Sequence, residues 1–257
     1  MWKYAKASVR GSAHLTNGLP CQDWSAIHTA SKDKSVLLCA LSDGAGSAKF
    51  ADEAARFLVS EAIRFLETQL ADHPKPSELI AEYDRSDGEA FIEQVQGRLR
   101  QMAEAQSVSL GEYSATLLFA AIHPEWSIFF QIGDGCWIVA RESVFGAVTW
   151  PTQGEFVGQT VFVASAAAKS ELQIQKLRGS LRCVVGITDG LERLALDLRG
   201  RVPHPGFFAP LVNALSRTTD TELFEKELVA FLESERVCER TDDDKSIILV
   251  TQHECCL

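Results

Sequence analysis

The sequence lacks the features of an exported or membrane-spanning chain. Its first residues, MWKYAKASVRGSAH, contain no apolar core region of the kind that a signal peptide carries. Its longest apolar runs, such as ATLLFAAI at 115–122, fall well short of the roughly 18 residues needed to cross a bilayer. We therefore expect a soluble, cytoplasmic protein that has no membrane partner.

Positive charge is also scarce. The chain has 25 Lys and Arg against 35 Asp and Glu, a net charge of -10. Nucleic-acid binding needs a dense basic patch, so the balance argues against a nucleic-acid partner. Carboxylates can bind divalent cations, although most acidic proteins simply have acidic surfaces.

Repeats, low-complexity tracts and domain linkers are absent as well. With 46% hydrophobic and 23% charged residues over 257 positions, the composition is that of an ordinary globular protein with a substantial core. We expect one domain spanning residues 1–257.

The seven cysteines include no CxxC pair, which argues against a structural zinc site. Cys39, Cys136 and Cys183 sit inside apolar runs and are expected to be reduced core thiols. Two more, at 255–256, belong to an exposed, oxidisable tail without an assigned function.

Short apolar runs alternate with amphipathic segments. The runs that are rich in β-branched and aromatic residues predict strands at 35–43, 114–122, 126–134, 136–141, 160–165, 182–189 and 245–252. Helical spacing predicts helices at 51–70, 88–106 and 221–235. Gly133-Asp134-Gly135 predicts a tight hairpin between two of the strands. The pattern favours sheets packed together with helices outside, and periodicity alone describes a mixed α+β domain equally well.

Aspartates recur at the ends of the predicted strands. The segments are CQD at 21–23, LSDGAG at 41–46, IGDG at 132–135, ITDGLER at 187–193 and TDDDKSIILV at 241–250. Any one of them is usually a turn or a solvated charge run. Five in one chain can converge on one edge of a sandwich, where a cation would neutralise them. Counting alone leaves both interpretations open.

A metal at this edge would have a definite chemistry. Oxygen ligands without a His or Cys cluster favour Mg²⁺ or Mn²⁺ over zinc. Two such ions about 4 Å apart can deprotonate a bridging water and clamp a phosphoryl group. Gly44 has no Cβ, so its backbone carbonyl could reach a metal.

The ordered set of Asp23, SDGAG, SATL, GDG, TDGL and DDKS before an apolar strand resembles the metal-dependent PPM/PP2C-type protein phosphatases. It is most similar to the compact bacterial branch, in which GxxH…G…CQD opens the domain. The resemblance runs from Gly11 to Thr251. It implies an α+β fold, a four-layer α-β-β-α sandwich of two mainly antiparallel sheets flanked by helices, with a two-metal centre at one end.

The resemblance also implies roles for single residues. Asp43 would bridge the two metals, the Gly44 carbonyl would ligate one of them, and Asp189 and Asp243 would complete the shell of the other. Asp23 would act near the first metal, directly or through water. A metal-bridging water would attack a phosphoserine or phosphothreonine in line, without a covalent phosphoenzyme.

The neighbouring acids have alternative assignments. Glu112 falls where some bacterial members carry an Asp for a third metal. Glu112 can equally be interpreted as an exposed acid before a strand. Asp134 matches the family's Gly-Asp turn and is interpreted as structural support. Asp242 and Asp244 flank Asp243, so a slip of one residue in that assignment stays open.

The chain departs from the family pattern at two places. Many members have a phosphate-binding Arg where this chain has Gly18, and neither Arg10 nor His14 stands at the matching position. The family's histidine general acid is replaced by Ala45. Leaving-group protonation would then fall to a metal-bound water or to His14, and both departures bear on substrate affinity and rate.

Three function classes follow. The first is a Mg²⁺/Mn²⁺-dependent phosphatase acting on phosphoserine or phosphothreonine proteins and opposing a serine/threonine kinase. The second is a catalytically weak or inactive module that keeps this fold and binds a phosphoprotein or regulator. The third, a covalent Asp-nucleophile phosphohydrolase, needs an Asp-x-Asp motif, and Ala45 occupies the second Asp position.

Overall fold

Two five-stranded antiparallel sheets form the centre of the protein. The structure is a computed structural model, and it describes residues 2–151 and 160–252. The first sheet has the order β1 (Trp2–Val9), β12 (Lys245–Gln252), β9 (Cys183–Ile187), β6 (Cys136–Ala140) and β7 (Phe145–Ala147). The second has the order β2 (Asp23–Thr29), β3 (Leu37–Asp43), β4 (Leu117–Ile122), β5 (Trp126–Ile132) and β8 (Gln173–Arg178).

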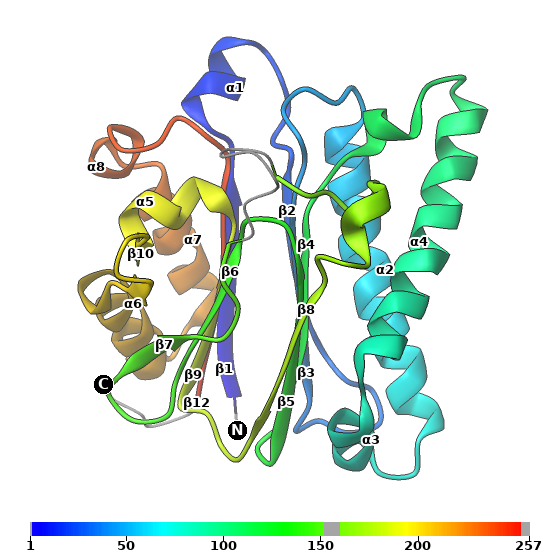
Figure 1. The fold of residues 1–257 in the computed structure, drawn as a ribbon. Coiled ribbons are helices and arrows are strands. Elements are labelled where there is room, and N and C mark those ends of the chain that lie inside the picture. The colour runs from blue at the N-terminus through cyan, green and yellow to red at the C-terminus, as the bar shows by residue number, and fades with distance from the viewer. Residues whose placement is uncertain (1, 152–159, 253–257) are drawn as a thin grey trace.

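Helices cover the outer face of each sheet (Figure 1). The second sheet is covered by α2 (Ala51–Asp72), α3 (Pro76–Glu82) and α4 (Arg85–Ala105). On the first sheet lie α5 (Glu192–Ala195), α6 (Pro205–Arg217), α7 (Thr221–Leu232) and α8 (Glu235–Cys238). The remaining elements are α1 (Ser12–Thr16), the 3-10 turns η1 (Leu110–Tyr113), η2 (Ala166–Ala168) and η3 (Asp189–Leu191), and a two-stranded ribbon of β10 (Leu196–Asp197) and β11 (Val202–Pro203). The expected four-layer α-β-β-α sandwich is confirmed.

The central strands read as continuous apolar runs because both of their faces are buried. In β3, Leu37 and Leu41 face the other sheet, while Leu38 faces the helices. In β12, Ile248 packs between the sheets and Leu249 packs toward α6 and α7. Alternate side chains therefore fill two different cores, and each sheet is held from both sides.

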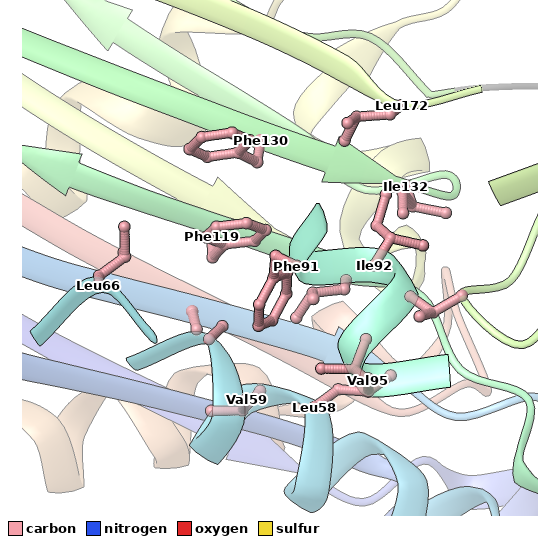
Figure 2. Packing of buried hydrophobic residues seen from close by; sticks show 14 of the residues in the cluster. Leu58, Val59, Leu66, Phe91, Ile92, Val95, Phe119, Phe130, Ile132 and Leu172 are labelled. Atoms are coloured by element: carbon pink, nitrogen blue, oxygen red, sulfur yellow. The ribbon is translucent and has the colours of Figure 1, made fainter. Parts of the chain in front are cut away.

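Aromatic packing fixes the helical layer to the second sheet. Phe119 and Phe130, on adjacent strands, stack with ring centroids 4.4 Å apart and planes 3° apart. Phe91 of α4 packs on Phe119 at 5.0 Å, in the cluster that Figure 2 shows. Such pairs add about 0.5–1.5 kcal/mol each beyond area burial.

The predicted helices are confirmed within a few residues, whereas one predicted strand is wrong. Residues 160–165 contain no strand and lead through a turn into η2. Their apolar side chains have another role, because Val163 is fully buried in the helix-side core. The strand in this region is β8, which the sequence analysis missed because an edge strand with the sequence QIQKLR carries no apolar run.

The predicted hairpin at Gly133-Asp134-Gly135 is also wrong. β5 pairs with β4 and β8, while β6 belongs to the other sheet, so this turn carries the chain from one sheet to the other. Gly133 adopts a φ of 107°, and a Cβ there would lie 2.5 Å from Thr116 Cγ2. The turn thus places Asp134 at the end of the sandwich, between the two sheets.

No helix in the described part of the chain is long and apolar enough to span a membrane. The cysteines at 255–256 lie outside the described residues.

Candidate metal centre

The candidate acids converge at one end of the sandwich. Asp23 begins β2 and Asp43 ends β3, and the antiparallel register places them directly opposite each other. Asp189 follows the end of β9, Asp243 precedes β12, and Asp134 lies between β5 and β6. The charges of these acids act on one another's pKa, as expected for one shared site.

Three of the carboxylates form the tightest group. One oxygen from each of Asp43, Asp134 and Asp189 lies within 4.8 Å of the others. Asp43 and Asp189 were predicted here, but Asp134 was interpreted as structural support. Asp134 joins the group because the turn that contains it carries the chain from β5 in one sheet to β6 in the other.

Burial and mutual repulsion disfavour the ionised forms of these groups. Burial raises the pKa of Asp23 to about 7. It also raises the pKa of Asp43 well above its usual range, and the charges of Asp23 and Asp189 add to the effect. The pKa of Asp189 is likewise raised by burial and then by Asp134 and Asp243. A site with these properties favours protons or metal cations.

In the described part of the chain, the side chains of these five aspartates make no ion pair with a Lys, Arg or His, and the buried Lys245 donates to the backbone carbonyl of Asp243 instead. Asp23 Oδ2 accepts a hydrogen bond of 2.7 Å from Thr188 Oγ1. Asp23 Oδ1 and Asp134 Oδ1 are buried and have no hydrogen-bond partner among the described residues. Unpartnered buried carboxylate oxygens are the donor atoms that Mg²⁺ or Mn²⁺ prefers, so these residues fit a divalent cation.

Two glycines allow the loops of the site to pack closely. A Cβ on Gly44 would lie 2.6 Å from the carbonyl oxygen of Ala51, the first residue of α2. One on Gly190 would lie 1.9 Å from the carbonyl oxygen of Asp244. Gly44 was expected to be small so that its carbonyl could approach a metal. What the structure shows at this position is the close approach of α2, while the approach of a metal stays a prediction.

Asp243 and Asp244 occupy different environments. Asp244 is buried, and its carboxylate accepts hydrogen bonds from the backbone N–H groups of Gly11 (2.6 Å) and Gln22 (2.5 Å). Asp243 is exposed, and its charge acts on Asp134 in the tight group. The neighbouring Asp242 contributes its backbone carbonyl, which accepts from the N–H of Ala13 on α1. This division favours Asp243 over its two neighbours as the cation-facing residue.

Glu112 lies outside the tight group. Its Oε2 accepts a 2.8 Å hydrogen bond from the backbone N–H of Lys49, and its carbonyl accepts one from Phe50. Glu112 thus braces the segment between Asp43 and α2.

The two departures from the family pattern have a structural context. Gly18 adopts a left-handed φ of 68°, which an arginine rarely tolerates. Arg10 is exposed and donates to the carbonyl oxygen of Leu19. Ala45 is buried in a small apolar cluster with Ala48 and the first turn of α2. His14, by contrast, lies beside the site, with Nδ1 2.9 Å from Asp244 Oδ2.

The sequence analysis missed one further acid. Glu192 begins α5, and its Oε1 is buried without a hydrogen-bond partner among the described residues. Burial and the charge of Asp134 raise the pKa of Glu192 to about 8. Its position three residues after Asp189, at a helix start, was the available signal.

Comparison with known proteins agrees with this geometry. A model of the family described as protein phosphatase 2C matches residues 10–233. The chain is 31% identical over 254 residues to serine/threonine-protein phosphatase 3 of Escherichia coli (strain K12), covering 96% of this chain and 97% of the relative.

Solved structures show the same fold at lower identity. The serine/threonine phosphatase of S. agalactiae superposes with a TM-score of 0.66 at 16% identity, covering 98% of this chain and 99% of the other. The serine/threonine phosphatase Stp1 of Staphylococcus aureus gives 0.63 at 14% identity, covering 98% and 96%. From the match over most of its length, the chain belongs to the protein phosphatase 2C family.

Proposed function

We propose that this protein is a Mg²⁺- or Mn²⁺-dependent phosphatase acting on phosphoserine and phosphothreonine in proteins. The observation that carries the proposal is the group of Asp43, Asp134 and Asp189, three carboxylates that converge without an ion pair to any described Lys, Arg or His. Two divalent ions would offset this repulsion. When bound, they would activate water and neutralise charge on the phosphoryl group.

In the proposed site, Asp43 would hold both ions and the Gly44 carbonyl would help to hold one of them. Asp189 and Asp243 would hold the other ion. Asp23, whose carboxylate accepts a hydrogen bond from the hydroxyl of Thr188, would act on the first ion directly or through water. The oxygens of these residues would balance the charge of the ions and hold them in place.

A third ion would find a better ligand in Asp134 than in Glu112. Asp134 has an unpartnered buried oxygen in the tight group, while the carboxylate of Glu112 binds a backbone N–H. The assignment of Glu112 to a third metal therefore stays a prediction, and Asp134 is the competing one.

The substrate class rests on the relatives. The Escherichia coli relative is named a serine/threonine-protein phosphatase, and we propose the same class of substrate here. The physiological role would then be to oppose a serine/threonine kinase.

The test is hydrolysis of a phosphothreonine peptide and of p-nitrophenyl phosphate with Mn²⁺. Turnover of both is expected, with loss on chelation by EDTA and recovery when Mn²⁺ is restored. Asp43→Asn should remove the activity, whereas Asp72→Asn, an exposed acid at the end of α2, should not. Folded wild-type protein that binds Mn²⁺ but turns over neither substrate would support the alternative, a module that binds phosphoproteins without hydrolysing them.

A further inference from the structure

A histidine and a buried aspartate form a pair beside the candidate metal centre. His14 lies on α1, the short helix beyond one end of the two sheets (Figure 1). Its Nδ1 is 2.9 Å from Asp244 Oδ2, and the exposed fractions of the two side chains are 12% and 1%. The pair is therefore largely shielded from water.

The aspartate of this pair is held rigidly. Asp244 Oδ1 accepts from the backbone N–H of Gly11, and Oδ2 accepts from that of Gln22 in addition to facing the imidazole. A carboxylate fixed by two backbone donors cannot turn away from its partner. It holds the proton of the imidazole on Nδ1 and leaves Nε2 to face outward from the pair.

That second nitrogen faces the loop that follows Asp43. A methyl group placed on Gly46 would lie 3.8 Å from His14 Nε2 and 4.0 Å from Gln22 Oε1. Gln22 Oε1 is buried and has no hydrogen-bond partner among the described residues. An imidazole nitrogen and an unpartnered oxygen thus both lie near Gly46.

The surroundings of the imidazole tie it to the metal centre. The three segments that it approaches are those of Gly46, Gln22 and Asp244. Gly46 follows Asp43 by three residues, and the other two are each next to a candidate ligand. The imidazole therefore lies beside the segments that carry the candidate ligands Asp23, Asp43 and Asp243.

We propose that His14 donates the proton to the serine or threonine oxygen that leaves phosphorus, and that Asp244 is the positioning residue that makes this possible. The inference rests on the proposed phosphatase function, and it names the residue that protonates the leaving group. His14 would touch the substrate through Nε2, while Asp244 would act only through His14.

The step balances as follows. A water oxygen forms a bond to phosphorus, and the bond from phosphorus to the serine or threonine oxygen breaks with its electron pair on that oxygen. The Nε2 proton of the imidazolium goes to this oxygen, giving the free hydroxyl. One proton of the attacking water is released to solvent, and the imidazole regains a proton from solvent. The carboxylate of Asp244 stabilises the imidazolium before transfer, as in other histidine–carboxylate pairs.

Two substrates with different leaving groups distinguish protonation of the leaving group from a role in phosphate binding or loop packing, which would affect both substrates. Threonine leaves as a strongly basic alkoxide and needs a proton, whereas p-nitrophenolate is a stable anion and needs none. His14→Asn keeps an amide that can bind Asp244 but has no acidic proton. We expect it to lower kcat for a phosphothreonine peptide by about 10²-fold or more and to change kcat for p-nitrophenyl phosphate by less than about 3-fold.

The matched control is His28, which also pairs with a carboxylate in the described part of the chain. His28 Nε2 lies 3.5 Å from Glu67 Oε2 on the β2 side of the molecule, outside the acidic end. His28→Asn should leave both reactions unchanged. If the wild type hydrolyses neither substrate, the proposed phosphatase function itself fails. The role of His14 is judged only when the wild type is active, from the rates of His14→Asn relative to the wild type on the two substrates.

Asp244→Asn tests the positioning role. It should reproduce the selective loss on the phosphothreonine peptide, and the double variant with His14→Asn should lose no more than either single one. In the wild type, ¹⁵N NMR of the neutral His14 ring should show the proton on Nδ1, a readout that does not depend on any variant folding.

Three results would overturn the proposal. One is an equal loss on both substrates, in kcat or in KM, which would assign His14 to phosphate binding or to loop packing. Another is an unchanged rate in His14→Asn. The third is a neutral His14 ring protonated on Nε2.

Discussion

Asp23 and Asp43 lie directly opposite each other across β2 and β3, at the open end of the second sheet. Like charges in such a cross-strand pair normally destabilise a sheet. Here Asp23 is buried and Asp43 half-buried, and the pKa of each acid is raised. The fold therefore holds a repulsive pair whose cost a cation would offset.

The first prediction concerns stability and metal. Because a ligand that binds only the folded state stabilises it, Mn²⁺ at 100 times its Kd should add about 2.7 kcal/mol and raise the Tm of EDTA-treated protein by several degrees. Asp43→Asn removes one charge of the opposed pair, so it should raise the Tm of the metal-free protein and abolish the Mn²⁺ shift. Differential scanning calorimetry measures both. A Mn²⁺ shift that survives in Asp43→Asn would contradict the assignment.

The second prediction is the pH dependence of the metal-free protein. Burial raises the pKa of Asp23 to about 7 and of Glu192 to about 8, well above their unfolded values of about 4. Between pH 4 and 8 the folded state then binds more protons than the unfolded state, so its free energy of unfolding falls as pH rises. The Tm measured in EDTA should drop between pH 5.5 and 8, and Asp23→Asn should make the drop shallower. A Tm that rises over this range would count against the buried, unneutralised carboxylates.

The third prediction concerns the close-packed glycines. Gly44→Ala and Gly190→Ala place a Cβ against backbone oxygens of Ala51 and Asp244, and each should cost about 1–3 kcal/mol of unfolding free energy. Gly97→Ala in α4 is the matched control, because its Cβ would meet nothing within 4 Å. It should stabilise the protein by about 0.5–1 kcal/mol. Urea denaturation measures whether the free energy of unfolding falls or rises in each variant. An unchanged free energy of unfolding in Gly44→Ala would show that the loop can move away from α2.

The fourth prediction separates Asp134 from Glu112. Asp134→Asn weakens a carboxylate of the tight group, so isothermal titration calorimetry should show weaker or fewer Mn²⁺ sites. Glu112→Gln loses part of the hydrogen bond to Lys49 N–H, so it should lower the free energy of unfolding by about 1 kcal/mol and leave the Mn²⁺ stoichiometry unchanged. The reverse result would return the third-metal role to Glu112.

The fold could be predicted from the sequence wherever a buried element has a recognisable apolar pattern. β3 and β12 contain the continuous apolar runs LLCAL and IILV because both faces of these strands are covered, and these runs predicted strands correctly. β8 escaped because an exposed edge strand carries no such pattern. Residues 160–165 misled for the opposite reason, since Val163 is buried in a loop.

The candidate site was predicted in its residue types but not in its geometry. Adjacent acids in the sequence cannot be told apart without the structure, which gives Asp244 two backbone donors and leaves Asp243 exposed. Asp134 was misjudged because a Gly-Asp-Gly turn reads as a hairpin, and only the sheet topology shows that it crosses between sheets. Long-range pairing, rather than local pattern, decides both cases.

The most direct test of the account is turnover of a phosphothreonine peptide by purified protein with Mn²⁺, after EDTA, and after Mn²⁺ is restored. We predict phosphate release that disappears on chelation, returns with the metal, and is absent in Asp43→Asn. Phosphate release that persists unchanged in EDTA, or a folded wild type that binds Mn²⁺ and releases none, would contradict a metal-dependent phosphatase centre at these aspartates.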